Sequence, residues 1–142
     1  MPREMNLPDD RLKIAEARVA ELERELANRS RLEELYAFMQ ASIDYAPDMV
    51  IWCDRDGRIV WANQTAAQGL GYDRAHLVAR MLSDVTPELP NSTWDHFWSE
   101  TPAGEAIAAE TRIRREDGTL IPVETRATHV IVHRAHYCCI IA

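Results

Sequence analysis

The chain is poor in several residue types, and each shortage excludes a class of protein. It has three cysteines, five glycines and, by count, one lysine against fifteen arginines. An odd number of cysteines, two of them adjacent at Cys138 and Cys139, argues against a disulfide framework. Turns and helix ends account for most of the glycines, so a phosphate-cradling glycine loop is not recognisable. No set of residues with the pattern of an enzyme active site is present either.

Basic charge and long apolar runs are also scarce. The net charge is −7, and no direct nucleic-acid contact is expected because phosphate binding requires a clustered basic face. No apolar run approaches the roughly 18 residues that cross a bilayer, and no basic leader with an apolar core opens the chain. We therefore expect a cytoplasmic segment without membrane insertion.

The first third of the chain predicts a long helix. At 142 residues the chain has room for one globular domain and an extension. Residues 1–8 are expected to be a flexible N-terminus, residues 9–44 a coiled-coil helix, and residues 45–142 the domain. A heptad repeat places apolar or small residues at its a and d positions, namely Leu12, Ala15, Val19, Leu22 and Leu26.

Charges beside this apolar seam favour a parallel homodimer. Arg11 and Arg18 fall at g, and Glu16 and Glu23 fall at e, so the g to e′ pairs have opposite signs. A change of winding is expected near residues 28–31, after which the seam resumes with Leu32, Leu35 and Met39. The alternative is a single amphipathic helix that folds back on its own domain.

Residues 50–72 predict a hairpin followed by a capped helix. The apolar runs 51–54 and 58–62 are separated by a turn in which Gly57 tolerates positive φ. The Asn63 side chain is placed to cap a helix, and Gly71 is placed to end it.

The rest of the chain predicts short helices and then three strands. Asp73 can cap a helix through Arg80, residues 81–90 are loop-like, and Asn91 or Ser92 can cap a helix that ends near Pro102. Alternation then predicts strands on either side of a turn at Gly118, and a last strand over 137–141. The expected register pairs cross-strand residues of opposite charge and two apolar residues, namely Arg112 with Glu124, Glu110 with Arg126, and Ile113 with Val123.

These motifs together resemble the PAS domain family. They are D-R-D-G at 54–57, N-Q-T-A-A-Q at 63–68, L-G-Y at 70–72 and R-R-E-D-G-T at 114–119, and the resemblance runs from about Ala41 to Ala142. It implies an α+β fold: a five-stranded antiparallel sheet with short helices on one face, preceded here by the long N-terminal helix.

The resemblance places any ligand between the inner sheet face and the short helices. Candidates for the pocket lining are Ile51, Cys53, Trp94, Trp98, Thr111, Ile113, Val123, Thr125, Cys138 and Ile140. The alternative is a filled apolar core, because few polar groups in this set could orient a ligand. The candidate dimer interface combines the helix seam with the outer sheet face: Leu12, Val19, Leu22, Leu26, Leu35, Val50 and Trp52.

No cofactor is expected. The flavin-binding light-sensing branch of the family has a reactive cysteine where this chain has residues 80–84, which contain none, so covalent flavin photochemistry is not expected. His96 is a single candidate axial ligand for haem, a secondary alternative. A metal site at His129, His133 and His136 is not expected, because the first two lie about 13 Å apart along a strand at about 3.3 Å per residue.

The resemblance implies a regulatory segment without catalytic residues of its own. It would be a cytosolic sensor and dimerisation module of a larger signal-transduction protein, for example in a two-component system. A rearrangement of sheet or coiled coil would relay the signal. The alternatives are a small-molecule or cofactor sensor, with haem or flavin in an occupied pocket, and a purely structural homodimerisation module.

Overall fold

The computed structural model describes residues 7–142, which form two compact units that meet between Ala41 and Ser42. The first unit consists of helix α1 (Leu7–Asp44), whose last residues belong to the second unit. Most of the predicted flexible N-terminus lies outside the described residues, and Leu7 and Pro8 are helical. The helix is continuous across residues 28–31, and the change of winding predicted there, which concerns two paired helices, stays a prediction.

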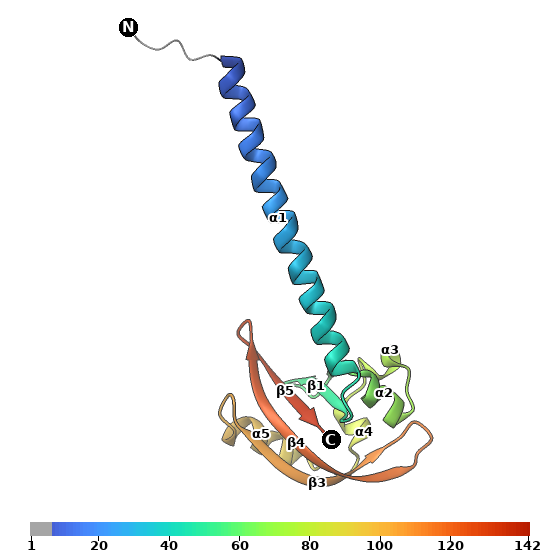
Figure 1. The fold of residues 1–142 in the computed structure, drawn as a ribbon. Helices are drawn as coiled ribbons and strands as arrows, with labels where there is room; N and C mark the ends of the chain where they lie inside the picture. Colours follow the sequence, from blue (N-terminus) through green and yellow to red (C-terminus); the bar gives the residue numbers. More distant parts are fainter. Residues whose placement is uncertain (1–6) are drawn as a thin grey trace. The chain divides into compact units, whose positions relative to one another are not determined.

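The second unit is a five-stranded antiparallel sheet with short helices (Figure 1). The strands are β1 (Val50–Asp54), β2 (Ile59–Ala62), β3 (Ala106–Arg114), β4 (Leu120–Val132) and β5 (Ala135–Ile141), in the spatial order β2-β1-β5-β4-β3. The helices are α2 (Gln64–Leu70), α3 (Arg74–Leu77), α4 (Leu82–Val85) and α5 (Asn91–Glu100). The predicted fold class is therefore confirmed.

Local chemistry shapes the β1–β2 turn and the two ends of α2. Asp54 Oδ1 accepts hydrogen bonds from the backbone N–H groups of Asp56 and Arg58, and Gly57 has φ +86°. Asn63 Oδ1 accepts from the Ala66 N–H at 2.9 Å, which caps the start of α2. Gly71 ends the helix with φ +78°, a left-handed conformation that costs glycine little.

The other short helices differ from the expectation in three ways. Helix α3 ends at Leu77 rather than Arg80, and Asp73 precedes it without a side-chain capping bond. The predicted loop 81–90 contains α4, in which Asp84 Oδ2 accepts from the Met81 N–H at 3.1 Å. Neither Asn91 nor Ser92 caps α5, because Pro90 occupies the N-cap position and both residues are inside the helix.

The predicted register of β3 and β4 is wrong by two residues. Glu110 lies opposite Glu124, and Ile113 lies opposite Ile121. The turn decides the register: Gly118, at φ +86°, allows the Arg115 N–H to donate to Thr119 O at 2.9 Å directly after the last strand pair. This closure outweighs cross-strand ion pairs, which contribute only about 0.2–1 kcal/mol each. Arg112 instead pairs with Glu88, with Nε donating at 2.9 Å.

The core lies between one face of the sheet and the helices. Six fully buried apolar side chains from sheet and helices mark its centre: Cys53, Ile59, Leu70, Leu77, Val85 and Cys138. Each large aliphatic side chain removed from water contributes about 1.5–3 kcal/mol. The packed helices thereby define the inner face of the sheet, which is where a ligand pocket was expected.

Candidate functional site

An apolar cavity of about 60 Å³ lies between the inner sheet face and helices α4 and α5. Its lining residues come from the sheet and from the segment 82–97: Leu82, Thr86, Leu89, Thr93, Trp94, Phe97, Ile107, Ala109, Thr111, Thr125, Ala127, Cys138 and Ile140. An engineered cavity of about 150 Å³ holds benzene. The space here is smaller, so a ligand of that size also requires adjoining space.

Five of the ten residues proposed to line a pocket meet in this cavity: Trp94, Thr111, Thr125, Cys138 and Ile140. Ile51 and Ile113 line a smaller space of about 20 Å³ deeper in the core, together with Thr125 and Ile140. Cys53 is fully buried in the core, and Val123 packs against this core cluster. Trp98 lies beside Phe97 and His129 rather than in the cavity lining.

The part of the lining between α4 and the start of α5 was not predicted from the sequence. Leu82, Thr86 and Leu89 fall in the segment predicted as loop, where no helical period was available to orient them. Leu82 and Val85 are apolar residues one helical turn apart, and both are buried. This spacing is the sequence signal that indicates a short helix here. Ile107, Ala109 and Ala127 continue the alternation of the strands.

Two of the four threonine hydroxyls that line the cavity are committed to the backbone. The Thr86 hydroxyl donates to Leu82 O at 2.8 Å, and the Thr125 hydroxyl donates to Ala109 O at 3.0 Å. Burial raises the pKa of the Cys138 thiol to about 12, with the neighbouring Cys139 as a second cause. The cavity therefore presents no charged group at neutral pH, which disfavours a charged ligand inside it.

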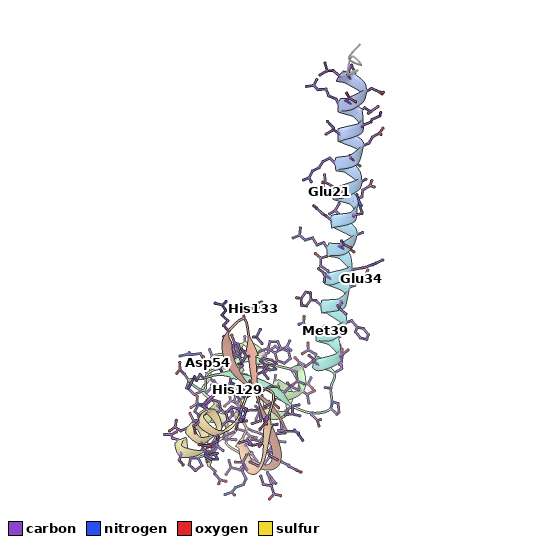
Figure 2. All side chains as sticks on the ribbon, turned by 90° about the vertical axis from the view of Figure 1, so that its left-hand side faces the viewer. Glu21, Glu34, Met39, Asp54, His129 and His133 are labelled. Carbon is purple, nitrogen blue, oxygen red and sulfur yellow. The ribbon has the colours of Figure 1, made fainter. Side chains whose placement is uncertain are left out.

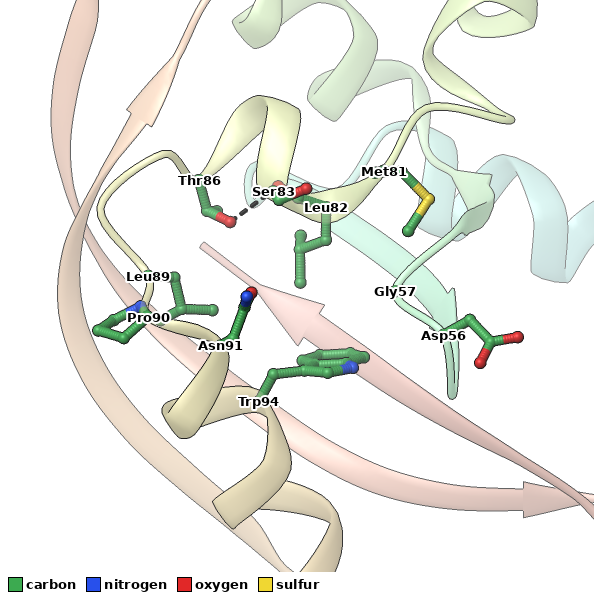
Figure 3. Close-up of a pocket in the computed structure, with 10 residues that line it drawn as sticks. All are labelled: Asp56, Gly57, Met81, Leu82, Ser83, Thr86, Leu89, Pro90, Asn91 and Trp94. Atoms are coloured by element: carbon green, nitrogen blue, oxygen red, sulfur yellow. Dashed lines mark hydrogen bonds between the residues drawn. The ribbon is translucent and has the colours of Figure 1, made fainter.

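A second space of about 120 Å³ adjoins the cavity and opens toward the β1–β2 turn (Figure 3). The two spaces share Leu82, Thr86, Leu89 and Trp94, so we call the outer one the mouth of the cavity. The indole Nε1–H of Trp94 donates to Arg55 O at 3.0 Å, which fixes the ring beside the turn. Trp94 and the two leucines thus form the wall between mouth and cavity.

Gly57 keeps the turn close to this wall. A Cβ at that position would lie 3.7 Å from the Met81 methyl and 3.8 Å from the Trp94 ring, and its φ is +86°. Gly57 therefore adopts a left-handed turn conformation and also lies close to Met81 and Trp94. This position explains why the turn can reach over the mouth.

The histidines of α5, β4 and the β4–β5 turn lie in different surroundings. His96 is exposed on α5, whereas His129 is buried on β4 and His133 lies in the β4–β5 turn (Figure 2). His129 Nδ1 donates to Thr101 O at 2.7 Å, and its Nε2 lies 2.8 Å from His136 Nδ1. Within residues 7–142, no three His, Cys, Asp or Glu side chains are arranged to hold a metal ion.

The last residues of α1, which belong to the second unit, are bonded to the rest of that unit through Asn63. The Asn63 Nδ2 donates to Ile43 O at 2.8 Å and to Asp48 O at 3.0 Å, while its Oδ1 also accepts from the Val50 N–H. All four hydrogen-bonding positions of this buried amide are used. The side chain therefore ties together the helix end, strand β1 and the start of α2.

A second tie runs from the same residues to the outer sheet face. Asp44 forms an ion pair with Arg74, whose Nε donates to Ala62 O at 2.8 Å. The Arg74 guanidinium lies 5.6 Å from the ring centroid of Trp61, the cross-strand neighbour of Trp52. Asp44 is thus connected to the aromatic residues of β1 and β2.

The outer face of the sheet carries half-buried apolar side chains. Trp52 packs against Tyr137 with ring centroids 6.0 Å apart, and Cys139 lies opposite Trp52. Val50 lies on the same face, opposite Ile141, which is exposed. Such an apolar patch is typical of an interaction surface.

On α1 the proposed seam is open to solvent in the single chain (Figure 2). Between 40% and 65% of each seam side chain is exposed at Leu12, Val19, Leu22, Leu26 and Leu35. Arg18 makes an ion pair within the helix, with Glu21, at 2.8 Å. Among the described helices, none is long and apolar enough to span a membrane.

Comparisons with solved structures identify the fold. The PAS domain of an HTR-like protein from Haloarcula marismortui matches with TM-score 0.76 and 24% identity, over 81% of this chain and 95% of that one. A PAS domain from a two-component sensor histidine kinase matches with TM-score 0.69 and 19% identity, over 79% and 96% of the chains. The PAS domain of nitrogen regulation protein NR(II) from Vibrio parahaemolyticus matches with TM-score 0.61 and 14% identity, over 72% and 93%.

Sequence comparison with curated proteins finds no matching relative. The sequence profile described as PAS domain matches residues 47–142, which is more than half of the chain and all five strands. Helix α1 precedes the matched region. The chain belongs to the PAS domain family.

Proposed function

We propose that the chain is a cytosolic sensor and dimerisation module of a larger signal-transduction protein. The observation that carries this proposal is the double attachment of the α1 end, through Asn63 and through Asp44 with Arg74. A change in the sheet at β1 or β2 would alter these bonds and so the direction in which the helix leaves the domain. The role is regulatory rather than catalytic.

The dimer in this proposal is a parallel homodimer through α1 and the outer sheet face. It is supported by the exposed seam, by the opposite charges that flank it, and by the apolar residues around Trp52. A second copy of the chain offers the same seam and matching charges. A change in the conformation of the sheet would reach the helix through the contacts of Asp44, Arg74 and Trp61.

The oligomeric state of paired α1 variants tests the dimer. The double variant Leu22→Ser with Leu26→Ser places hydroxyls at d and a and is expected to be monomeric by light scattering after size exclusion. Ala20→Ser with Ala27→Ser makes a similar change at two b positions away from the seam and is expected to stay dimeric. An unchanged dimer in the first variant would reject the coiled-coil part.

A second candidate function is a small-molecule sensor. It is favoured by the adjoining cavity and mouth, which together reach from solvent to Cys138 and Ile140 on the inner face of β5. Native mass spectrometry of freshly purified chain tests it, since one spectrum reports subunit number and retained mass. A defined extra mass supports the sensor, whereas a bare dimer supports a purely structural dimerisation module.

A further inference from the structure

We propose that the cavity and its mouth bind a small uncharged molecule, an aromatic ring or a ring-sized apolar body with one hydrogen-bonding group, which Asn91 orients. This inference rests on the second candidate function, the small-molecule sensor. It names both the ligand class and the residue that selects it.

The space sets the size of the molecule. Neither the cavity of about 60 Å³ nor the mouth of about 120 Å³ equals the roughly 150 Å³ that holds benzene, but the two adjoin behind one shared wall. A molecule that occupies both spaces requires Leu82 or Leu89 to move. A single ring with one or two substituents fits the joined space, whereas a haem or a flavin is far larger.

The wall sets the polarity of the molecule. The hydroxyls of Thr86 and Thr125 already donate to backbone carbonyls, and the Cys138 thiol is held protonated by burial. The charged residue that lines the mouth is Asp56, and its carboxylate points away from the space in Figure 3. No group is therefore placed to compensate a buried charge, so the molecule inside must be neutral.

Asn91 provides an amide at the mouth, next to the hydroxyl of Ser83. Its amide points from α5 toward Leu82 and Thr86 into the mouth (Figure 3). The side chain makes no hydrogen bond with any of residues 7–142, and it does not cap its own helix, because Pro90 takes that position. An amide both donates and accepts, so it can pair with a hydroxyl or an amine-type N–H at the edge of an apolar ring.

Three single-ring probes separate the parts of the proposal: phenol and toluene, which match in size, and the slightly larger anion benzoate. We expect phenol and toluene to shift the indole N–H resonance of Trp94 and the methyl resonances of Leu82 and Leu89 in titrations of the full chain. Phenol should bind about three- to tenfold more tightly than toluene, the range for one hydrogen bond. Benzoate should cause no shift at these signals.

Two substitutions on the exposed first turn of α5 assign the selectivity without disturbing the core. Asn91→Leu should remove the difference between phenol and toluene while toluene still binds. Ser92→Ala, one residue further along and outside the lining of the mouth, should leave both affinities unchanged. Equal affinity of the unaltered chain for phenol and toluene, or no effect of Asn91→Leu, would overturn the role of Asn91.

The ligand proposal and the dimer proposal fail separately. If neither phenol nor toluene shifts the three reporter side chains at millimolar concentration, the cavity is closed to this class of molecule and the inference is wrong. A chain that is dimeric in that same experiment would still support the dimerisation module. If benzoate binds as well as phenol, the argument from the uncharged wall is wrong.

Discussion

The side-chain amide of Asn63 donates to the carbonyl oxygen of Ile43 across 2.8 Å, so that a residue capping α2 also closes the end of α1. The same amide accepts from the Val50 N–H on strand β1. One buried side chain thus joins three elements. Its amide uses all four of its hydrogen-bonding positions in doing so.

Replacement of Asn63 by Ala should destabilise the second unit by about 3 kcal/mol. The cap is lost, and the partly buried backbone groups of Val50 and Ile43 lose their partner. Urea unfolding followed by tryptophan fluorescence measures the change. The exposed neighbour Gln64→Ala serves as the control and should change stability by less than about 0.5 kcal/mol; a similar loss in both variants would contradict the role of Asn63.

The β3–β4 turn depends on the left-handed conformation of Gly118. At φ +86° a Cβ meets no atom within 4 Å, so the cost of Gly118→Ala comes from the backbone alone, about 1–2 kcal/mol. Gly118→Asn should cost less, because Asn tolerates this region better than Ala. Thermal unfolding of the two variants gives the comparison, and an alanine variant as stable as the parent would refute the strain argument.

The buried thiols should make the domain less stable at alkaline pH. Burial raises the pKa of Cys138 from 9.0 to about 12, and the pKa of Cys53 is raised by burial as well. Between these pH values the unfolded chain releases a proton that the folded chain retains, so the free energy of unfolding falls as pH rises, by about 1.4 kcal/mol per pH unit for each thiol.

The Cys138→Ala variant tests this pH dependence. Its stability between pH 9 and 12 should fall less steeply than that of the parent, by about one thiol's share. Below pH 8 the two curves should run parallel, separated by the cost of the lost packing. Identical slopes above pH 9 would show that Cys138 does not retain its proton in the folded chain.

The His129–His136 contact should stabilise the end of β4 and the loop after α5. His136→Phe would leave the buried Nε2 of His129 without a partner, at a cost of about 2 kcal/mol. His133→Asn, in the exposed turn with φ +47°, provides a control that keeps a residue type suited to positive φ. Chemical denaturation compares them, and equal stability of the two variants would contradict the contribution of the histidine pair.

Features set by neighbouring residues could be predicted from the sequence. The turn at Gly57, the cap at Asn63 and the helix end at Gly71 each depend on a side chain and the backbone within a few residues of it. The alternation of β3 and β4 likewise indicates which side chains face the core. Such local hydrogen bonds depend little on how the rest of the chain folds.

Features that depend on distant residues could not be predicted. The β3–β4 register was wrong because it depends on how the turn at 115–119 closes, and that turn is also bonded to the end of α2, where the Glu116 N–H donates to Leu70 O at 2.8 Å. Helix α4 was missed because four residues carry too little periodicity to be recognised. Asn91 or Ser92 was predicted to cap α5, but Pro90 takes that position, and only the tertiary structure shows where the Asn91 amide points.

The sequence by itself determined the family, the alternating strands and the apolar seam of α1, because each of these is a repeated local pattern. The tertiary structure decided the register, the partners of Asn63 and of His129, and the cavity between Trp94 and the sheet. These depend on contacts between different elements of the fold, several of them 20 or more positions apart, such as Asn63 with Ile43 and Trp94 with Arg55. Such contacts exist only once the sheet has brought those segments together, which is why no local pattern reveals them.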